Sequence, residues 1–516
     1  MPKEVRPTPP VPIIDLFAGP GGLGEGFSSL RAADGSRLFQ LKLSIEMDTH
    51  AHRTLELRAF YRQFGDEERP KEYYEYVRNP SKPSRDALFA AYPVEANAAR
   101  EEAWEYELKS STARTVKRRV DRALAGAEIW VLIGGPPCQA YSVVGRSRQA
   151  RNKEAFAKDP RHRLYTRYLR ILRDHQPPFF VMENVKGILS SRLGGSSAFA
   201  RVLEDLEGAG KGYDVYSFVQ PVPADGKLSP TDYIIRSEEY GIPQARHRVI
   251  LFGVRKDRAV APGILAPFGR EVTVEDVIST LPALRSRLSA RSSSADSFTA
   301  WADVMRRAPA LMDGADLLTR EKVSTVLSGV SERNEDLLNT RFWAGRSDVG
   351  AHAGWYLRDR RLLGVTNHEA RSHMPSDIQR YLFCSVFTEV HDRSPVLADF
   401  PDPLLPAHVN LSEGVAGVGF ADRFRVQRRN HPSTTITSHI SKDGHYYIHY
   451  DPSQARSLSV REAARLQTFP DDYFFEGNRT QQYHQVGNAV PPLLARQLAE
   501  VVAHAIGRES EPGIPK

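Results

Sequence analysis

The sequence predicts an α/β fold in which helices cover both faces of a mostly parallel sheet and a smaller domain is inserted. Short apolar runs bounded by turn residues recur along the chain, and the first run leads through a glycine-rich turn into a segment with helical periodicity. This alternation is typical of parallel sheets with crossover helices. The chain has 516 residues, more than one typical domain, so a second domain is expected.

The strands of the sheet can be assigned from short runs bounded by turn residues, and the last three of these runs are continuously apolar, which indicates burial on both faces. The five predicted strands are Val11–Phe17, Leu41–Ile45, Ile129–Ile133, Phe179–Met182 and Val249–Val254. Residues 50–128, between the second and third strands, are rich in Arg, Glu and Tyr and predict a largely helical insert.

The chain divides by composition into two domains. Residues 11–254 form the first part of the main domain, and residues 255–427 are rich in Pro, Ser, Arg and scattered aromatics and predict the inserted smaller domain. Residues 428–508 return to the main domain. Their last helix, predicted at Leu493–Ala505, is expected to pack beside the first strand.

Composition excludes several classes of protein. No apolar run is long enough to span a bilayer, and the segment Met1–Pro12 lacks the layout of a signal peptide. Two cysteines cannot form a disulfide framework, and they lack the spacing of metal ligands. We therefore expect a cytoplasmic protein without a metal. The net charge of +7 and the pI near 9.2 favour a polyanionic partner.

The first turn, Asp15–Gly24, contains glycines where a strand turns sharply into a helix. Backbone N–H groups can therefore approach a cofactor closely. Glu46 ends the next predicted strand, in a position to accept hydrogen bonds from ribose hydroxyls. The pattern predicts a nucleoside cofactor and does not choose between NAD and S-adenosylmethionine; a simple turn is the alternative.

Three further motifs lie at predicted strand ends. The turn Gly134–Gln139 presents Cys138 either as an accessible thiol or as a small buried side chain. Glu183 ends another strand, as a helix cap or a catalytic acid. The motif Gln244-x-Arg246-x-Arg248 has a two-residue period that would place its side chains on one face, as a charged edge or as a cluster that holds a polar ligand.

Together and in order, the motifs of this chain resemble those of the cytosine-5 DNA methyltransferase family of bacterial restriction-modification type. Each motif alone is weak or moderate, whereas the whole set in register is very specific. The matching motifs are Phe17-Ala-Gly19, Pro137-Cys138-Gln139, Glu183-Asn184-Val185, Gln244-x-Arg246-x-Arg248, Leu458–Pro470 and Gln485–Pro491.

The resemblance implies a DNA (cytosine-5-)-methyltransferase with the Rossmann-like fold of S-adenosylmethionine-dependent methyltransferases. The target cytosine would be flipped out of the duplex, and Cys138 would attack its C6 so that C5 becomes nucleophilic enough to accept the methyl group. Glu183 in its protonated form would be the acid or hydrogen-bond donor at N3 and the exocyclic amine of the base. Arg248 would hold O2, supported by Arg246.

The resemblance also assigns binding residues. The product would be S-adenosylhomocysteine, and no metal is implied. Cofactor contacts are expected from Asp15, Phe17, Gly19, Gly21, Gly22, Glu46, Met47, Pro136, Asn488 and Val490. DNA contacts are expected from Gln139, Ser142, Arg146 and Arg148. The family's Asp-bearing block between Glu46 and the cysteine turn, which contacts the adenine amine, has no clear match here.

Residues 255–427 occupy the place of the family's target-recognition domain, and their aromatic and basic clusters, such as Trp355-Tyr356 and Arg358–Arg361, are candidates for DNA contact or for core packing. The expected partner is double-stranded DNA, bound by a monomer in the bacterial cytoplasm without membrane contact. A cognate restriction endonuclease would act separately. The alternatives are an RNA (tRNA) cytosine-5 methyltransferase and a catalytically inactive DNA-binding relative. Cys384 is expected in the core.

Overall fold

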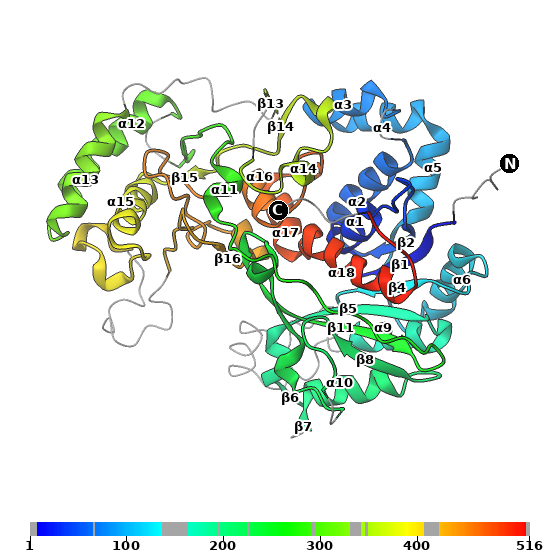
Figure 1. Cartoon of the computed structure of the whole chain (residues 1–516). Helices are drawn as coiled ribbons and strands as arrows, with labels where there is room; N and C mark the ends of the chain where they lie inside the picture. The colour runs from blue at the N-terminus through cyan, green and yellow to red at the C-terminus, as the bar shows by residue number, and fades with distance from the viewer. Residues whose placement is uncertain are drawn as a thin grey trace. The chain divides into compact units, whose positions relative to one another are not determined.

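The computed structural model describes residues 8–65, 68–136, 164–193, 196–223, 226–291, 295–330, 342–345, 349–406 and 423–511 (Figure 1). Its contacts group the chain into two compact units. Unit 1 comprises Met1–Pro70, Arg85–Arg270 and Ala489–Lys516, and unit 2 comprises Lys71–Ser84 and Glu271–Asn488.

The core of unit 1 is a sheet with the strand order β3-β2-β1-β4-β5-β11-β8, to which β9 adds beside β11. The strands from β3 to β5 are mutually parallel, and β11 is antiparallel to β5, β8 and β9. The predicted α/β class with a mostly parallel sheet is thus confirmed. The strand bounds are β1 Val11–Leu16, β2 Phe39–Glu46, β3 Ala103–Glu105, β4 Val131–Gly134, β5 Phe179–Val185, β8 Tyr213–Ser217, β9 Ile234–Arg236 and β11 His247–Arg255.

Helices connect these strands and bury them. Alternate residues of β1, Ile14 and Leu16, pack in one core with side chains from α6, α9 and α10. α1 packs against α18, which brings the last helix of the chain beside the helix that follows the first strand. The helices of unit 1 are α1 Gly22–Ser29, α2 Thr49–Arg62, α4 Lys82–Ala91, α5 Pro93–Glu102, α6 Ala113–Leu124, α9 Leu164–His175, α10 Ala198–Glu207 and α18 Pro492–Ala505. Short strands β6 Arg192–Leu193, β7 Ser196–Ser197 and β10 Gln244–Ala245 complete it.

The largely helical insert predicted at residues 50–128 also contains one short strand. Ala103–Glu105 forms β3, which pairs in parallel with the end of β2. A three-residue strand is too short to produce a hydrophobic pattern, and only its pairing partner makes it recognisable.

Unit 2 has a separate core in which α15 packs against α12 and α13. Residues 428–488 group with this unit, so the compact units divide the chain differently from the predicted domains, whose functional assignment stays a prediction. The helices are α3 Lys71–Arg78, α11 Val274–Ile278, α12 Phe298–Arg306, α13 Leu317–Ser328, α14 Ala353–Tyr356, α15 Pro375–His391, α16 Val460–Leu466 and α17 Arg479–Asn488. The strands are β12 Arg287–Leu288, β13 Phe342–Ala344, β14 Gly364–Thr366, β15 Ser372–His373 and β16 Ser433–Thr434.

Across the described ranges, no helix has both the length and the apolar character needed to cross a membrane.

Candidate active site

The carboxyl ends of four parallel strands meet at one edge of the unit 1 sheet. Leu16 pairs with Ile45 on one side and with Gly134 on the other, and Gly134 pairs in turn with Met182. The residues that follow these four positions therefore lie along one edge, where open α/β sheets bind their ligands.

The glycine turn after β1 depends on unusual backbone angles. Phe17, Gly19 and Gly21 have φ values of 56°, 57° and 97°, and Gly21 caps the start of α1. Gly22 follows in the helix, where a Cβ atom would lie 2.2 Å from the carbonyl oxygen of Val490. The turn and the segment before α18 thus approach each other at backbone distance, which only glycine allows.

Glu46 holds this turn from the end of β2. Its Oε2 accepts a hydrogen bond from Gly19 N at 2.8 Å, and its Oε1 accepts one each from Met47 N and Asp48 N, both at 2.8 Å. Burial raises the pKa of the Glu46 carboxyl, against these backbone donors, which lower it. A carboxylate offers about four acceptor positions, so roughly one remains for an incoming hydroxyl.

Asp15 lies beneath the same turn and is 1% exposed. Within the described part of the chain, neither of its carboxylate oxygens has a hydrogen-bond partner. Burial and the neighbouring Glu46 raise the pKa of the Asp15 carboxyl well above its usual range. A buried carboxylate without a partner is costly, so this position suits a cationic or hydrogen-bonding group from outside the chain.

Buried ion pairs join the helices around the turn. Glu25 of α1 receives two hydrogen bonds from Arg58 of α2, at 2.9 and 2.7 Å, and Arg62 of α2 lies 3.3 Å from the same carboxylate. Arg62 also pairs with Glu102 of α5 at 2.5 Å. The charges of Glu25, Arg58, Arg62 and Glu102 are thus paired with one another. Asp15 is not part of these ion pairs.

A second group of residues surrounds the end of β5. Glu183 Oε1 lies 2.9 Å from Arg248 Nε of β11, and both side chains are largely buried. A Cβ atom on Gly135 would lie 3.0 Å from Glu183 Oε2, so the carboxylate packs against the turn that follows β4. Burial lowers the pKa of the Arg248 guanidinium, and the Glu183 carboxylate opposes this effect. The pair thus lies against Gly135, which precedes Cys138 by three positions in the sequence.

A family model described as C-5 cytosine-specific DNA methylase matches residues 95–332 and 368–504. The chain belongs to this family. As a C-5 cytosine-specific DNA methylase it is a DNA (cytosine-5-)-methyltransferase, which confirms the prediction drawn from the motifs.

Two curated relatives cover nearly the whole chain. The type II methyltransferase M.Bpa9945I of Bacillus paralicheniformis is 31% identical over 96% of this chain and 99% of its own length. The type II methyltransferase M.AgeI of Thalassovita gelatinovora is 27% identical over 96% of this chain and 99% of its own. The crystal structure of a prophage-encoded protein of E. coli, assigned as a DNA modification methyltransferase, aligns over 96% of this chain and 100% of that one, with a TM-score of 0.51 and 19% identity. This likeness concerns the fold alone.

The C-5 methylase family depends on S-adenosylmethionine, and the glycine turn fits such a ligand. Asp15 offers an unpartnered buried carboxylate, and the close backbone approach at Gly22 leaves no side chain in the way. Met47 lies at the same sheet edge, and its apolar side chain is 57% exposed among the described residues. Among the described residues, no cluster of His, Cys, Asp or Glu could hold a metal ion.

The remaining predicted site residues are distributed as follows. Pro136 is the last described residue of the cysteine turn, and Cys138, Gln139, Ser142, Arg146 and Arg148 lie outside the described residues. Val490 is buried and contributes its carbonyl beside Gly22. Asn488 belongs to unit 2, where it is exposed with its Nδ2 3.3 Å from His484 Nδ1.

The motif Gln244-x-Arg246-x-Arg248 is not one continuous strand, because β11 begins at His247. Gln244 lies in β10, and Arg246 lies between the two strands, buried, with its backbone N–H bonded to Ser237 Oγ at 3.0 Å. The single strand expected to carry this motif is therefore interrupted at Arg246. Only Arg248 stands in the strand that carries the ion pair with Glu183.

Sequence reasoning missed Glu105, which ends β3 directly beside Glu46 in the sheet register. Its Oε1 accepts a hydrogen bond from Thr49 Oγ1 at 2.6 Å, and its Oε2 lies 3.5 Å from His52 Nδ1. Glu105 lies between Glu46 and the cysteine turn, the interval in which the resemblance predicts the family's Asp-bearing block. Its only sequence signal was a position before a helical segment.

Two candidates for DNA contact in unit 2 are core residues instead. Trp355 and Tyr356 are buried, and they donate hydrogen bonds to the carbonyl oxygens of Thr468 and Arg465 at 2.8 and 2.7 Å. Cys384 is fully buried as expected, and burial raises the pKa of its thiol well above the usual range.

The penultimate motif, Leu458–Pro470, builds the framework of unit 2. Arg456 pairs with Glu462 at 2.6 Å, Arg465 pairs with Asp471 at 2.5 Å, and all four side chains are almost fully buried. Arg461 donates to Thr366 Oγ1 at 3.0 Å and to the carbonyl of Tyr473 at 2.8 Å. Because these guanidinium groups are saturated by the protein, their role is to fix the loops around α16.

Proposed function

We propose that this enzyme methylates C5 of cytosine within a short specific DNA sequence, with Cys138 as nucleophile, as the modification half of a restriction-modification system. One observation supports the site most directly: Glu183 and Arg248 pair at the edge of the sheet, against the backbone of Gly135, three residues before Cys138. The reaction requires an acid, a cation and a thiol, and this pair supplies the first two at the strand edge from which the sequence runs on to Cys138.

Cys138 acts as the nucleophile. Its thiolate adds to C6 of the flipped cytosine, and the electron pair of the C5–C6 double bond moves toward C5 and N3. Glu183 in its protonated form donates a hydrogen bond at N3 and accepts one from the exocyclic amine, which stabilises this charge. Once C5 has gained the methyl group, its proton leaves to water, and the electron pair of that C–H bond re-forms the C5–C6 double bond and expels the Cys138 thiolate.

Arg248 orients both Glu183 and the base. Its Nε lies 2.9 Å from the Glu183 carboxylate, and one terminal nitrogen, Nη1, donates to the carbonyl of His247 at 2.9 Å, so the other terminal nitrogen can hold O2 of cytosine. Arg246, buried beside β11, supports this strand end. A base that presents a different hydrogen-bonding edge would leave these groups unpaired.

S-adenosylmethionine supplies an electrophilic methyl group on a sulfonium centre. Asp15 and the backbone of Gly19, Gly21 and Gly22 hold its methionine end, and Glu46 uses its remaining acceptor position for a ribose hydroxyl. We add Phe17, Met47, Pro136 and Val490 as the walls of this pocket, with Glu105 as the acceptor for the adenine amine. No metal takes part.

The DNA-binding side consists of residues outside the described ranges and of the second domain. Gln139, Ser142, Arg146 and Arg148 contact the strand that carries the flipped base, and residues 255–427 recognise the sequence. The enzyme acts in the bacterial cytoplasm as a monomer, and a cognate endonuclease acts separately on the same sequence. The names of the full-length relatives, both type II methyltransferases, support this setting.

The decisive experiment incubates the purified protein with tritiated S-adenosylmethionine and mixed-sequence duplex DNA, followed by bisulfite sequencing. Wild type is expected to label cytosine C5 within one short sequence. Cys138→Ser is expected to bind DNA and cofactor without labelling. Cys384→Ser serves as the matched control and should retain activity, with its folding checked by circular dichroism.

Three results would contradict the proposal. Label in tRNA but not in DNA would indicate an RNA substrate, and label that survives in Cys138→Ser would remove the assigned nucleophile. Methylation of cytosines without sequence preference would remove the restriction-modification setting.

A further inference from the structure

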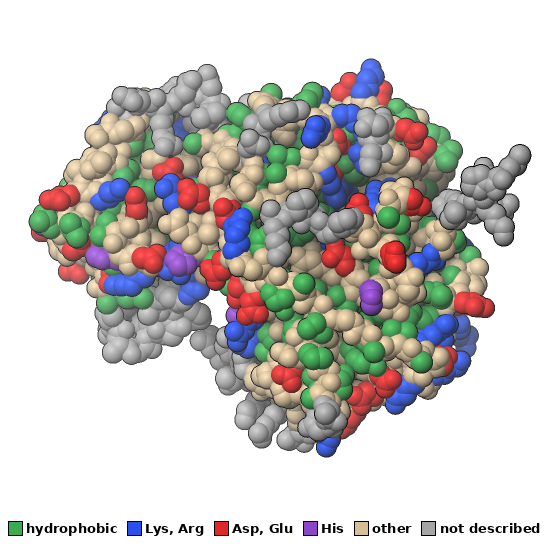
Figure 2. All heavy atoms as spheres, viewed as in Figure 1, with side chains coloured by type: hydrophobic (Ala, Val, Ile, Leu, Met, Phe, Trp, Pro, Cys, Tyr) green, Lys and Arg blue, Asp and Glu red, His purple; other side chains and the backbone are tan. Residues whose placement is uncertain are grey.

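The α6–α9 surface of unit 1, defined as residues 107–124 and 164–175, carries an unusual concentration of positive charge. These two segments contain nine Lys and Arg residues but only three Asp and Glu residues. Their formal charge of +6 is almost the whole net charge of the chain, which is +7. In the space-filling view, Lys and Arg side chains gather on the face around α6 and α9 (Figure 2).

Part of this charge is compensated by neighbouring acids. Lys109 pairs with Glu107 at 2.6 Å, Lys117 with Asp121 at 3.1 Å, and Arg170 with Asp174 at 3.4 Å. Asp121 also lies 3.1 Å from His175. Arg119 turns away from the surface to pair with Glu101 at 2.9 Å.

Five arginines remain, and within the described residues none of them has an acidic partner. They are Arg114, Arg118 and Arg122 of α6 and Arg167 and Arg173 of α9. The opposite faces of both helices are anchored in the core through residues such as Val116, Val120 and Tyr168. The arginines therefore point outward from fixed helices and repel one another unless an anion binds.

The spacing of these arginines matches a linear polyanion. Arg114, Arg118 and Arg122 recur at every fourth residue, so they share one side of α6 and are about 6 Å apart along its axis. Over roughly 12 Å they face three or four phosphates of one strand, which follow at about 3.4 Å intervals along a DNA axis.

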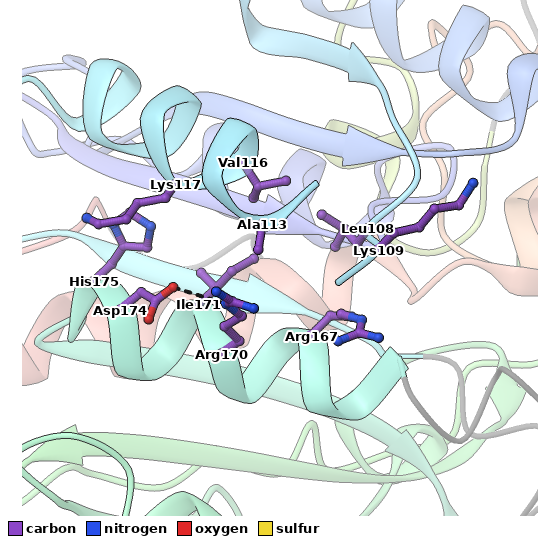
Figure 3. Close-up of a pocket in the computed structure, with 10 residues that line it drawn as sticks. All are labelled: Leu108, Lys109, Ala113, Val116, Lys117, Arg167, Arg170, Ile171, Asp174 and His175. Carbon is purple, nitrogen blue, oxygen red and sulfur yellow. Dashed lines mark hydrogen bonds and ion pairs between the residues drawn. The ribbon is translucent and has the colours of Figure 1, made fainter. Parts of the chain in front are cut away.

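The groove between the helices has a matching chemistry (Figure 3). Its floor is apolar, formed by Leu108, Ala113, Val116 and Ile171, and its charged lining consists of Lys109, Lys117, Arg167 and Arg170. His175 and one acid, Asp174, which pairs with Arg170, line it as well. Sugar rings of a nucleic acid backbone can lie on such a floor while the phosphates contact the rims.

The α6–α9 surface also begins at the edge of the sheet that carries the candidate active site. α6 starts shortly after the carboxyl end of β3, and α9 starts after the segment that contains Cys138, so both helices run from the reactive edge of the sheet toward its other edge. We propose that the α6–α9 surface binds the phosphate backbone of duplex DNA that flanks the target site. This rests on the proposed function, because the duplex it holds is the one that presents the cytosine.

The test compares two full-length variants that lose equal charge. Arg114→Gln/Arg118→Gln/Arg122→Gln removes three unpaired arginines from α6. The control Arg201→Gln/Lys211→Gln/Lys256→Gln removes three exposed cations elsewhere in unit 1. Fluorescence anisotropy measures the affinity for mixed-sequence duplex DNA across a series of salt concentrations, and circular dichroism checks folding.

We expect the α6 variant to lose about 0.9 in the slope of log K against log salt for each phosphate contact removed, hence roughly 2 to 3 in total. The control should keep the wild-type slope, and both variants should keep wild-type kcat at saturating DNA. Equal slopes for the two variants would overturn the proposal. The proposal would also be overturned if the α6 variant lost as much slope on a duplex that ends a few base pairs either side of the methylated cytosine, because that duplex has no flanking DNA. A slope change seen with RNA or an acidic protein but not with duplex DNA would overturn it too. Failure of wild type to methylate cytosine would instead refute the proposed function.

Discussion

Replacing Gly22 by Ala tests whether the glycine turn must approach the segment before α18. The new Cβ atom would lie 2.2 Å from the carbonyl oxygen of Val490 and 3.3 Å from Ala489 Cβ. Ordinary contact begins near 3.4 Å, so α1 and the start of α18 must separate by about 1.2 Å. The clashing atom belongs to the backbone, which cannot move aside by rotating a side chain.

Overpacking of this kind costs about 1 to 3 kcal/mol, and the upper end applies because backbone must move. Alanine recovers at most about 1 kcal/mol in helix propensity. We therefore expect a net loss of about 2 kcal/mol in the free energy of unfolding. A shift of about 1 Å in the turn should also weaken S-adenosylmethionine binding by at least about 10-fold.

Gly26→Ala is the matched control. Its Cβ atom would meet α18 equally closely, 2.4 Å from the carbonyl oxygen of Pro492, but one helical turn farther from the cofactor turn. Thermal unfolding should show both variants destabilised, and isothermal titration calorimetry should show weakened cofactor binding only in Gly22→Ala. Equal cofactor affinity in both variants would refute the assignment of the Gly22 approach to the cofactor site.

Three more changes test other parts of the structure. Glu46→Gln replaces a carboxylate that accepts three backbone hydrogen bonds. A charge-assisted hydrogen bond contributes about 1.5 to 3 kcal/mol, so the affinity for S-adenosylmethionine, measured by calorimetry, should fall about 10- to 100-fold. Unchanged affinity would contradict the role of Glu46 in cofactor binding. Burial lowers the pKa of His368 and of His449 to about 4, below the unfolded value of about 6.5. The contribution of these neutral histidines to the free energy of unfolding is therefore fully present above pH 6.5 and is lost as the pH falls toward 4. His449→Gln should reduce this decline in the melting temperature, and a decline as steep as in wild type would show that His449 does not titrate there. The Cys384 thiol is buried, and burial raises its pKa. Mass spectrometry after iodoacetamide treatment should therefore find Cys138 alkylated in the native protein and Cys384 alkylated only after unfolding. Rapid labelling of Cys384 in the native protein would contradict its burial.

Sequence patterns were sufficient for five of the eight described strands of the sheet and for the edge proposed to carry the site, whereas β3, β8 and β9 were not predicted. Apolar runs are local, so β1, β2, β4, β5 and β11 were each found within a few residues. The turn motifs follow those runs directly, and parallel connection places strand ends of the same sense at one edge. The family followed from the order of motifs, each of which is continuous in the chain.

Only the tertiary structure decided which side chains face one another. Glu183 and Arg248 are 65 positions apart and meet because β5 and β11 pair antiparallel in one register. Trp355 and Tyr356 are core residues because the carbonyls of Thr468 and Arg465 receive their hydrogen bonds. Local sequence carries neither the register nor the partner, since both depend on contacts between distant segments. Residue type and periodicity thus determined the fold class and the chemistry, whereas long-range packing determined the geometry that joins them.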